Sequence, residues 1–211
     1  MGYLTLAGDA HAELEVKRSR FLATVRRVPD EAAALELVAE HRRLYHAAGH
    51  HCSAFVIGPN QALVRVSDDG ELAGTAGLPM LNVLTGQGLS DVAAVVTRYF
   101  GGTLLGAGGL VRAYSGAVSA ALENAVTVRR RQLELFRVSV EPGQAGQLEW
   151  AVRNRGIAVR QVGYGRVAVV LTVAVASEGV GALRSLIATI TGGSASLQPD
   201  GQDWVDEPGN S

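Results

Sequence analysis

Cysteine is nearly absent from this sequence, since Cys52 is the single example among 211 residues. No disulfide can form within the chain, and such usage is typical of proteins in a reducing compartment. Long apolar runs are missing as well, because none reaches about 18 residues, the length that a membrane-spanning helix needs. The N-terminal residues lack the basic, apolar and small-residue segments of a secretory signal. We therefore expect a cytoplasmic protein that does not associate with a membrane.

The sequence also lacks a large excess of either positive or negative charge. Lys and Arg number 19, Asp and Glu number 20, and the net charge is −1. The chain as a whole therefore does not attract nucleic acid or anionic lipid, and any basic surface has to be local. The length allows one large domain or two of modest size, each able to bury a hydrophobic core.

The first half of the chain alternates between strand and helix patterns. Pro29-Asp30 ends a strand and can begin a helix, whose end is expected at Gly49. The run from Asp91 to Thr97 is almost continuously apolar, which is typical of a strand buried on both faces. Strands are predicted over 17–28, 51–57, 62–66 and 91–97, and helices over 30–49, 78–86 and 110–126.

The second half has the element order β-α-β-β-α-β, which predicts a ferredoxin-like domain. Ser177 is placed to cap the second helix, and Gly192-Gly193 to end it. Strands are predicted over 133–140, 157–163, 166–175 and 195–198, and helices over 142–152 and 177–190.

A charged triplet, Arg129-Arg130-Arg131, lies between the two halves and predicts a solvated linker. The last residues are polar and acidic, which predicts a flexible tail. We therefore predict an α+β protein with three parts, namely an N-terminal domain over 1–128, a ferredoxin-like domain over 129–199 and a flexible acidic tail over 200–211.

The most conspicuous motif is YFGGTLLGAGGLVRAY, residues 99–114, which contains five glycines. A strand followed by glycines and then a helix can present backbone N–H groups to an anion. A nucleotide-hydrolysing phosphate loop is excluded, because Ala107-Gly108 stands where Lys and Ser or Thr are required, and no G-x-G-x-x-G is present. Two interpretations remain: tight packing with positive φ, or contact with an anion or RNA backbone. For the second, the candidate residues are Arg98, Gly101, Gly102, Thr103, Gly106, Gly108, Gly109 and Arg112.

Three carboxylates, Asp68, Asp69 and Glu71, lie within four residues and offer oxygen ligands that a hard cation prefers. A calcium-hand loop is excluded because Pro79 occupies its twelfth position. Asp-Asp-Gly is also ordinary turn chemistry between a strand and a helix, and Thr75-Ala76-Gly77 can begin that helix. We predict neither a resident metal nor a cofactor and keep the three carboxylates as weaker polar or metal candidates.

His50, His51 and Cys52 combine imidazole and thiol groups, which are the ligands of zinc sites. Their spacing is poor for a metal, because a strand directs the adjacent side chains of His50 and His51 to opposite faces. Cys52 shares its predicted face with Ala54 and Val56, which favours a buried thiol over a nucleophile. The two histidines stay weaker polar or metal candidates.

Four motifs occur together in a fixed order: KRSRF (17–21), HHCSA (50–54), SDDGELAGTAGLPML (67–81) and VVTRYFGGTLLGAGGLVRAYSGAV (95–118). In this order they resemble the IMPACT family, and its bacterial YigZ-type members in particular. The resemblance implies an N-terminal two-layer α/β fold like the fourth domain of elongation factor G and the second domain of a small-subunit ribosomal protein. It also implies a C-terminal ferredoxin-like domain like the last domain of that factor.

The resemblance to translation proteins guides the functional prediction, although it supplies no catalytic residue. We predict a non-enzymatic protein that associates with RNA, the ribosome or a translation factor through the loop from Arg98 to Arg112. One alternative is a metal-assisted hydrolase acting on a small phosphorylated or peptide-linked substrate, with Asp68, Asp69 and Glu71 at its centre. A second alternative is a protein-protein adaptor that uses the exposed sheet of the C-terminal domain.

Overall fold

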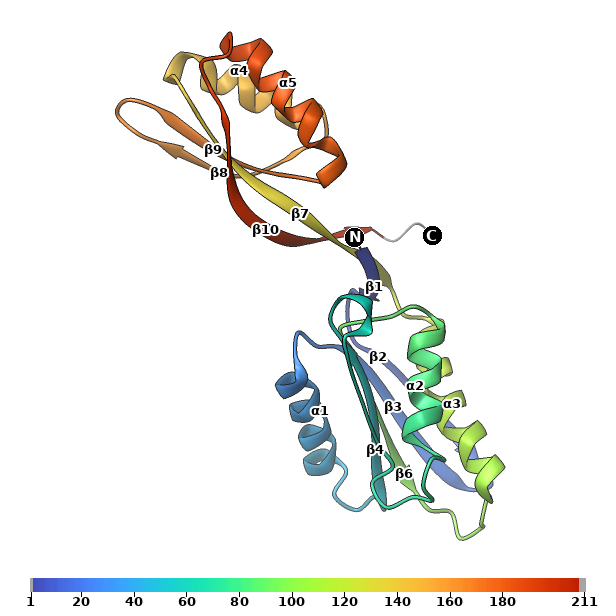
Figure 1. The fold of residues 1–211 in the computed structure, drawn as a ribbon. Coiled ribbons are helices and arrows are strands. Elements are labelled where there is room, and N and C mark those ends of the chain that lie inside the picture. Colours follow the sequence, from blue (N-terminus) through green and yellow to red (C-terminus); the bar gives the residue numbers. More distant parts are fainter. Residues whose placement is uncertain (1, 209–211) are drawn as a thin grey trace. The chain divides into compact units, whose positions relative to one another are not determined.

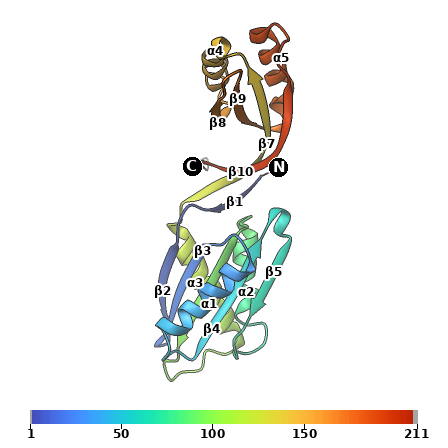
Figure 2. The same ribbon diagram turned by 90° about the vertical axis from the view of Figure 1, so that its left-hand side faces the viewer.

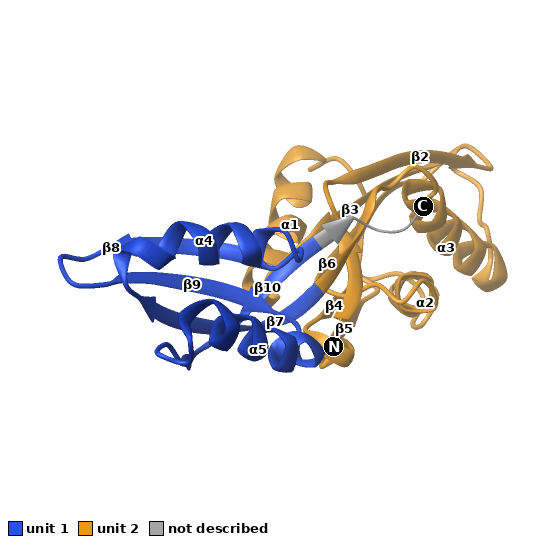
Figure 3. Ribbon diagram, turned by 90° about the horizontal axis from the view of Figure 1, so that it is seen from above, with its two compact units in different colours: residues 1, 131–206 blue, residues 2–130, 207–211 orange. Residues whose placement is uncertain are grey.

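A computed structural model describes residues 2–208 of the chain, and Figures 1 and 2 show it in two orientations. Figure 3 colours two compact units, an N-terminal unit of residues 2–130 and a C-terminal unit of residues 131–206. Each unit combines an antiparallel sheet with helices. The α+β class predicted from the sequence is confirmed.

The N-terminal unit is built on a sheet in the order β2-β3-β6-β4-β5, in which every neighbouring pair is antiparallel. Helices α2 and α3 cover one face of this sheet, and α1 covers the other (Figures 1 and 2). The strands are β1 (Gly2–Leu6), β2 (Ala10–Val16), β3 (Ser19–Arg27), β4 (His50–Ile57), β5 (Leu63–Ser67) and β6 (Val92–Tyr99). The helices are α1 (Glu31–Leu44), the short 3-10 helix Pro59–Gln61, α2 (Gly77–Gly86) and α3 (Ala107–Glu123).

Strand β6 explains why both faces of the sheet are covered. Ala94 and Val96 belong to the core under α2 and α3, whereas Ala93 and Val95 belong to the core under α1. Side chains alternate between the faces of a strand, so a continuously apolar strand needs a cover on each face. The predicted burial of this strand on both faces is confirmed, and α1 adds a third layer that the predicted two-layer sandwich lacked.

The helix boundaries follow local capping. Asp30 caps α1, because its carboxylate accepts the backbone N–H of Ala33 at 2.9 Å. The helix ends at Leu44, five residues before the predicted end at Gly49. Helix α3 begins at Ala107, so Gly108 and Gly109 lie in its first turn rather than in the loop before it.

The C-terminal unit has the predicted β-α-β-β-α-β order, and its strands lie in the order β10-β7-β9-β8. Strand β7 pairs with β1 as well. Helices α4 and α5 contribute Leu148, Leu183 and Ile187 to a core that also contains Leu171 of β9. The elements are β7 (Thr127–Val140), α4 (Pro142–Arg153), β8 (Ala158–Tyr164), β9 (Val169–Val175), the 3-10 helix Ser177–Gly179, α5 (Val180–Thr191) and β10 (Leu197–Pro208).

Three local predictions were wrong in this part of the chain. Residues 129–131 are not a linker, because they lie inside β7. Residues 200–208 are not a flexible tail, because they form most of β10, which pairs with β7; residues 209–211 lie outside the described part. Ser177 begins a 3-10 turn and makes no side-chain cap. The first two predictions were wrong because they relied on polar composition. Pairing between strands provides hydrogen bonds for the backbone N–H and C=O groups whatever the side chains are.

Candidate functional site

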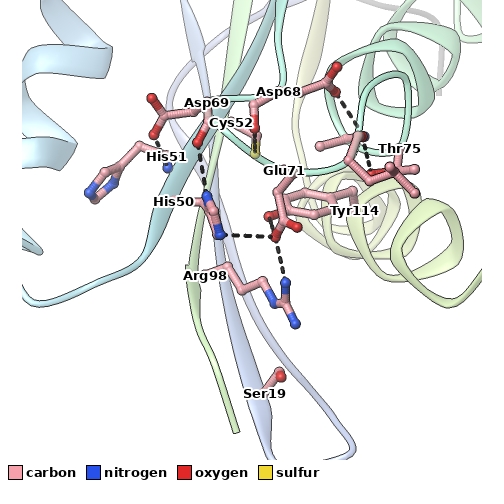
Figure 4. A network of polar contacts seen from close by, with 12 residues as sticks. Ser19, His50, His51, Cys52, Asp68, Asp69, Glu71, Thr75, Arg98 and Tyr114 are labelled. Carbon is pink, nitrogen blue, oxygen red and sulfur yellow. Dashed lines mark hydrogen bonds and ion pairs between the residues drawn. The ribbon is translucent and has the colours of Figure 1, made fainter. Parts of the chain in front are cut away.

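One end of the N-terminal sheet brings together the segments that the sequence singled out (Figure 1). Arg98, near the end of β6, lies opposite His50 at the start of β4. Strand β5 ends at Ser67, which lies opposite Ser53 of β4, and the acidic turn follows it. The glycine-rich stretch and the acidic turn therefore meet at the same end of the sheet, as the side chains in Figure 4 show.

Asp68 is engaged in holding the start of α2. Its carboxylate accepts the backbone N–H of Gly74 at 2.8 Å, of Ala76 at 3.0 Å and of Gly77 at 2.8 Å. Burial raises the pKa of Asp68, but these N–H donors outweigh it and leave the pKa below its ordinary value. The helix N-terminus predicted near Thr75 exists, and its N–H groups are occupied by Asp68.

Asp69 forms the tip of a tight turn. Asp69 and Gly70 have φ values of 44° and 83°, as a type I′ turn requires at its two central positions. The Asp69 carboxylate accepts from the Arg42 guanidinium and from the backbone N–H of His51, both at 2.6 Å. Its oxygens are therefore directed toward α1 and β4, away from those of Asp68.

Glu71 lies at the centre of a buried polar network (Figure 4). One oxygen, Oε1, accepts from Arg98 Nη1 at 2.6 Å and from the Tyr114 hydroxyl at 2.8 Å. The side chains of Glu71 and Arg98 are only 6% and 7% exposed, so this ion pair is desolvated. Burial is the main cause that raises the pKa of Tyr114, and the hydroxyl stays protonated as a donor.

Arg98 is held inside the unit. Its guanidinium carbon lies 5.6 Å from the ring centre of Phe21 and 5.5 Å from that of Phe100. Its Nε is buried and has no hydrogen-bond partner among the described residues. The prediction that Arg98 is a surface cation for an anion is therefore corrected: its charge is directed at Glu71.

His50 belongs to the same network. Its Nδ1 lies 2.9 Å from the carbonyl oxygen of Asp69, and because a carbonyl can only accept, Nδ1 carries the proton. The other ring nitrogen, Nε2, lies 3.8 Å from Glu71 Oε1. His50 therefore links the backbone of the acidic turn to the buried carboxylate.

His51 lies on the opposite face of the sheet, which confirms the predicted divergence of the two histidines. Its Nδ1 lies 3.0 Å from the hydroxyl of Thr97, and the same hydroxyl lies 3.1 Å from Nδ1 of His41 in α1. All three side chains are buried. Burial lowers the pKa of His41 to about 4 and also lowers that of His51, so both rings are neutral at pH 7.

Cys52 is a buried core residue, as its alternation with Ala54 and Val56 predicted. Its thiol donates to the carbonyl oxygen of Asp68 at 3.0 Å. Burial raises the pKa of Cys52 to about 12, so the thiolate that a nucleophile needs is not available at neutral pH.

A shared metal site is not supported by this geometry. Asp68, Asp69 and Glu71 each bind different partners, and within residues 2–206 no three His, Cys, Asp or Glu side chains are grouped so that they could hold an ion. The metal-assisted hydrolase required these carboxylates to converge. The three carboxylates instead connect the loops at this end of the sheet.

The glycines at 101, 102 and 106 allow a close backbone approach or a positive φ. A Cβ on Gly101 would lie 2.1 Å from the carbonyl carbon of Arg18, so only glycine fits against the turn between β2 and β3. The N–H of Gly101 donates to Ser19 Oγ at 3.0 Å. Gly102 and Gly106 have φ values of 79° and 71°. These three positions fit the interpretation as a tight turn.

Thr103, Gly108 and Gly109 complete the set of candidate residues in the glycine-rich stretch. The Thr103 hydroxyl accepts from Arg18 Nη2 at 3.0 Å, which ties the glycine loop to the neighbouring turn. Gly108 and Gly109 belong to the first turn of α3. A Cβ on Gly109 would lie 2.9 Å from the Cβ of Leu105, so its absence makes room for the incoming chain.

The exposed cations at this end were only partly foreseen. Lys17 and Arg18 form the exposed tip of the β2–β3 turn, and Arg112 is exposed on α3. Phe100 beside them is 57% exposed. A pocket of about 150 Å³ lies between the turn and α3, and Leu14, Val16, Lys17, Leu105, Gly109, Arg112 and Ala113 line it. Lys17 and Arg18 were not among the residues predicted from the sequence, although the KRSRF motif contains both.

A second pocket lies between α2 and α3. It measures about 480 Å³ and is lined mainly by apolar residues, with no charged side chain among them. These lining residues are Gly74, Leu78, Pro79, Asn82, Val83, Val111 and Ser115. The adaptor hypothesis, which concerned the C-terminal sheet, gains no support from this pocket and stays a prediction.

Comparison with known proteins places these residues in a family. The model of the Impact N-terminal domain matches residues 17–122. The IMPACT family member YvyE of Bacillus subtilis is 39% identical over 162 residues, which cover 77% of this chain and 75% of that protein. The chain belongs to the IMPACT family. The IMPACT family member YigZ of Escherichia coli is 42% identical over 137 residues, or 64% of this chain and 67% of YigZ.

A solved structure extends the likeness to nearly the whole chain. A crystal structure of a hypothetical protein is 36% identical, has a TM-score of 0.65 and covers 93% of this chain and 96% of its own. The matched Impact domain, residues 17–122, contains the turn at Lys17, the buried Glu71 network and the glycine-rich stretch. The four motifs that suggested the IMPACT family therefore meet at one end of one sheet.

No α-helix in the described residues is long and apolar enough to cross a membrane.

Proposed function

We propose that this IMPACT family member binds RNA, and that the end of its N-terminal unit contacts the phosphate backbone. The proposal rests on the placement of three exposed cations around the glycine-rich loop, namely Lys17, Arg18 and Arg112. They come from segments almost a hundred residues apart in the sequence. A local basic surface is what a chain of net charge −1 needs in order to hold a polyanion.

The exposed ring of Phe100 supports single-stranded RNA in particular. Phe100 immediately precedes Gly101, which packs against the backbone of Arg18, and the Phe100 ring lies 5.5 Å from the guanidinium carbon of Arg98. Proteins that bind single strands combine a cationic track for the backbone with aromatic side chains on which bases stack. An exposed aromatic near exposed cations fits that combination.

A binding role fits the surrounding polar groups better than catalysis does. Asp68, Asp69 and Glu71 are bound to backbone N–H groups or to cations, and the thiol of Cys52 is protonated. The side chains that could act as acid, base or nucleophile are therefore engaged in building this end of the unit.

The proposal is tested by the salt dependence of RNA binding. Fluorescence anisotropy with a labelled single-stranded oligonucleotide measures the affinity between about 50 and 200 mM salt. Each phosphate neutralised on a single strand contributes about −0.7 to the slope of log K against log salt. The triple variant Lys17→Gln, Arg18→Gln, Arg112→Gln is expected to bind more weakly and to flatten the slope by about 2.

The matched control removes one cation elsewhere. Arg184 is exposed on α5 of the C-terminal unit, so Arg184→Gln should leave the slope unchanged. Arg98→Ala is unsuitable, because it leaves Glu71 charged and buried, at a cost of about 3–5 kcal/mol of stability. The proposal fails if the natural protein shows no RNA binding at the lowest salt concentration, or if the triple variant keeps its full slope.

A further inference from the structure

The pocket between the β2–β3 turn and α3 has the size of one phosphate group with a few attached atoms. It measures about 150 Å³, and a water molecule occupies about 30 Å³ in the liquid. The pocket therefore has room for roughly five water-sized groups, close to the five heavy atoms of a phosphate. A base pair or a stacked pair of bases is too large for it.

The charge of the pocket is uniformly positive. Lys17 and Arg112 are the charged residues in its lining, and no carboxylate accompanies them. Within the described residues neither side chain has an ion-pair partner. The remaining walls are mainly apolar, with Leu14, Val16 and Leu105 among them, and apolar walls strengthen the attraction between an enclosed anion and these cations.

The first turn of α3 supplies a second source of positive potential. This helix has 17 residues, its N-cap Gly106 makes no side-chain cap, and its first turn contains no acidic residue. The Arg112 guanidinium lies beside that turn, because a Cβ on Gly108 would come within 3.8 Å of Nη1. Lys17, Arg112 and Gly109 of the first turn therefore line the same small volume.

We propose that this pocket receives the terminal phosphate of an RNA, a phosphomonoester. The inference rests on the proposed RNA-binding function and names the chemical group that the site prefers. A phosphomonoester has a charge of about −1.5 to −2 at pH 7, which two cations match. An internal phosphodiester has a single negative charge and two bulky substituents, and it fits a pocket of about 150 Å³ less well than a chain end.

The test compares oligonucleotides that differ at one end. The same single-stranded RNA is prepared with a 5′-phosphate, with a 3′-phosphate and with hydroxyl groups at both ends, and the affinity of the full chain is measured for each. One of the phosphorylated ends is expected to bind about tenfold more tightly than the hydroxyl form, the effect of one net charge-assisted hydrogen bond.

Two variants separate the pocket from the surrounding surface. Lys17→Gln and Arg112→Gln should each abolish the preference for the phosphorylated end, because both residues line the pocket. Arg18→Gln is the matched control, since Arg18 is exposed on the same turn but does not line the pocket. It should weaken the binding of all three oligonucleotides by the same factor and keep the preference.

The possible failures can be told apart. Equal affinity for phosphorylated and hydroxyl ends overturns the terminal-phosphate inference and leaves RNA binding intact. Absence of binding to any oligonucleotide overturns the proposed function, and a titration with adenosine monophosphate, followed by NMR, then decides about the pocket. Saturable shifts at Gly109 and Ala113 that Arg112→Gln removes would support a phosphate site, and unchanged spectra would exclude it.

Discussion

The carboxylate of Asp68 should contribute more to stability than an ordinary helix cap. It accepts three backbone N–H groups, those of Gly74, Ala76 and Gly77, whereas a typical cap accepts one. Replacing a cap residue by Ala costs about 1 kcal/mol, and a negative charge at a helix N-terminus contributes about 0.3–1 kcal/mol more. Asp68→Ala loses the charge and all three N–H bonds rather than one, so we expect a loss of about 3 kcal/mol in the free energy of unfolding.

Asp68→Asn separates charge from hydrogen bonding. One oxygen, Oδ1, accepts from Ala76 and Gly77, and the amide oxygen of Asn can keep both bonds. The bond from Gly74 to Oδ2 and the charge are lost, so a cost of about 1.5 kcal/mol is expected. Asp30→Ala is the matched control, because Asp30 caps α1 through one bond to Ala33, and about 1 kcal/mol is expected there.

Urea unfolding followed by far-UV circular dichroism measures these differences. Trp150 and Trp204 both lie in the C-terminal unit, so tryptophan fluorescence recorded in parallel reports that unit separately. The pKa of folded Asp68 lies below its unfolded value of about 4, so its contribution is present above that pH and disappears as the pH falls through the folded pKa. An Asp68→Ala variant as stable as the natural protein, or no more damaged than Asp30→Ala, would refute this reasoning.

Two further predictions concern buried ionisable side chains. The pKa of His41 is about 4 in the fold and about 6.5 when unfolded, so the unfolded ring binds a proton more readily and the stability falls as the pH drops below about 6.5, by about 2 kcal/mol from pH 7 to pH 5. Urea midpoints measured across this range should show that His41→Gln removes most of the loss. An unchanged pH dependence in the variant would contradict the assignment. Glu71→Gln leaves Arg98 charged and buried and should lower the free energy of unfolding by about 3 kcal/mol, whereas Tyr114→Phe should lower it by about 1 kcal/mol. Thermal unfolding should therefore show Glu71→Gln to be the less stable variant. The reverse order would argue against the network.

Apart from β1 and β2, which were not predicted, the order of strands and helices could be predicted because it depends on local patterns. The alternation around Cys52, the apolar run ending at Thr97 and the cap at Asp30 each fix an element within a few neighbours in the sequence. The β-α-β-β-α-β order of the second half has the same local origin. Such signals do not depend on which segments meet in space.

The candidate site could be predicted only as a set of segments. The motifs at His50, Asp68 and Arg98 were recognised, but their roles depend on pairings across the sheet. Arg98 looked like a surface cation, and the burial of its guanidinium against Glu71 follows from the register of β6 with β4. Asp68 was kept as a weaker polar or metal candidate, because the sequence does not show that Ala76 and Gly77 return to its carboxylate.

The absence of a side chain at Gly101 lets two backbone segments lie in direct contact. The backbone of Gly101 lies directly against that of Arg18, and the neighbouring hydrogen bond to Ser19 is between neutral groups. The segments that carry Lys17 and Arg112 are thus joined by contacts that neither salt nor pH can weaken. The backbone that carries these cations is therefore held without a ligand, which would limit the conformational entropy lost on the proposed binding. For the proposed binding of RNA, this predicts that high salt releases the polyanion without changing the backbone that carries the cations.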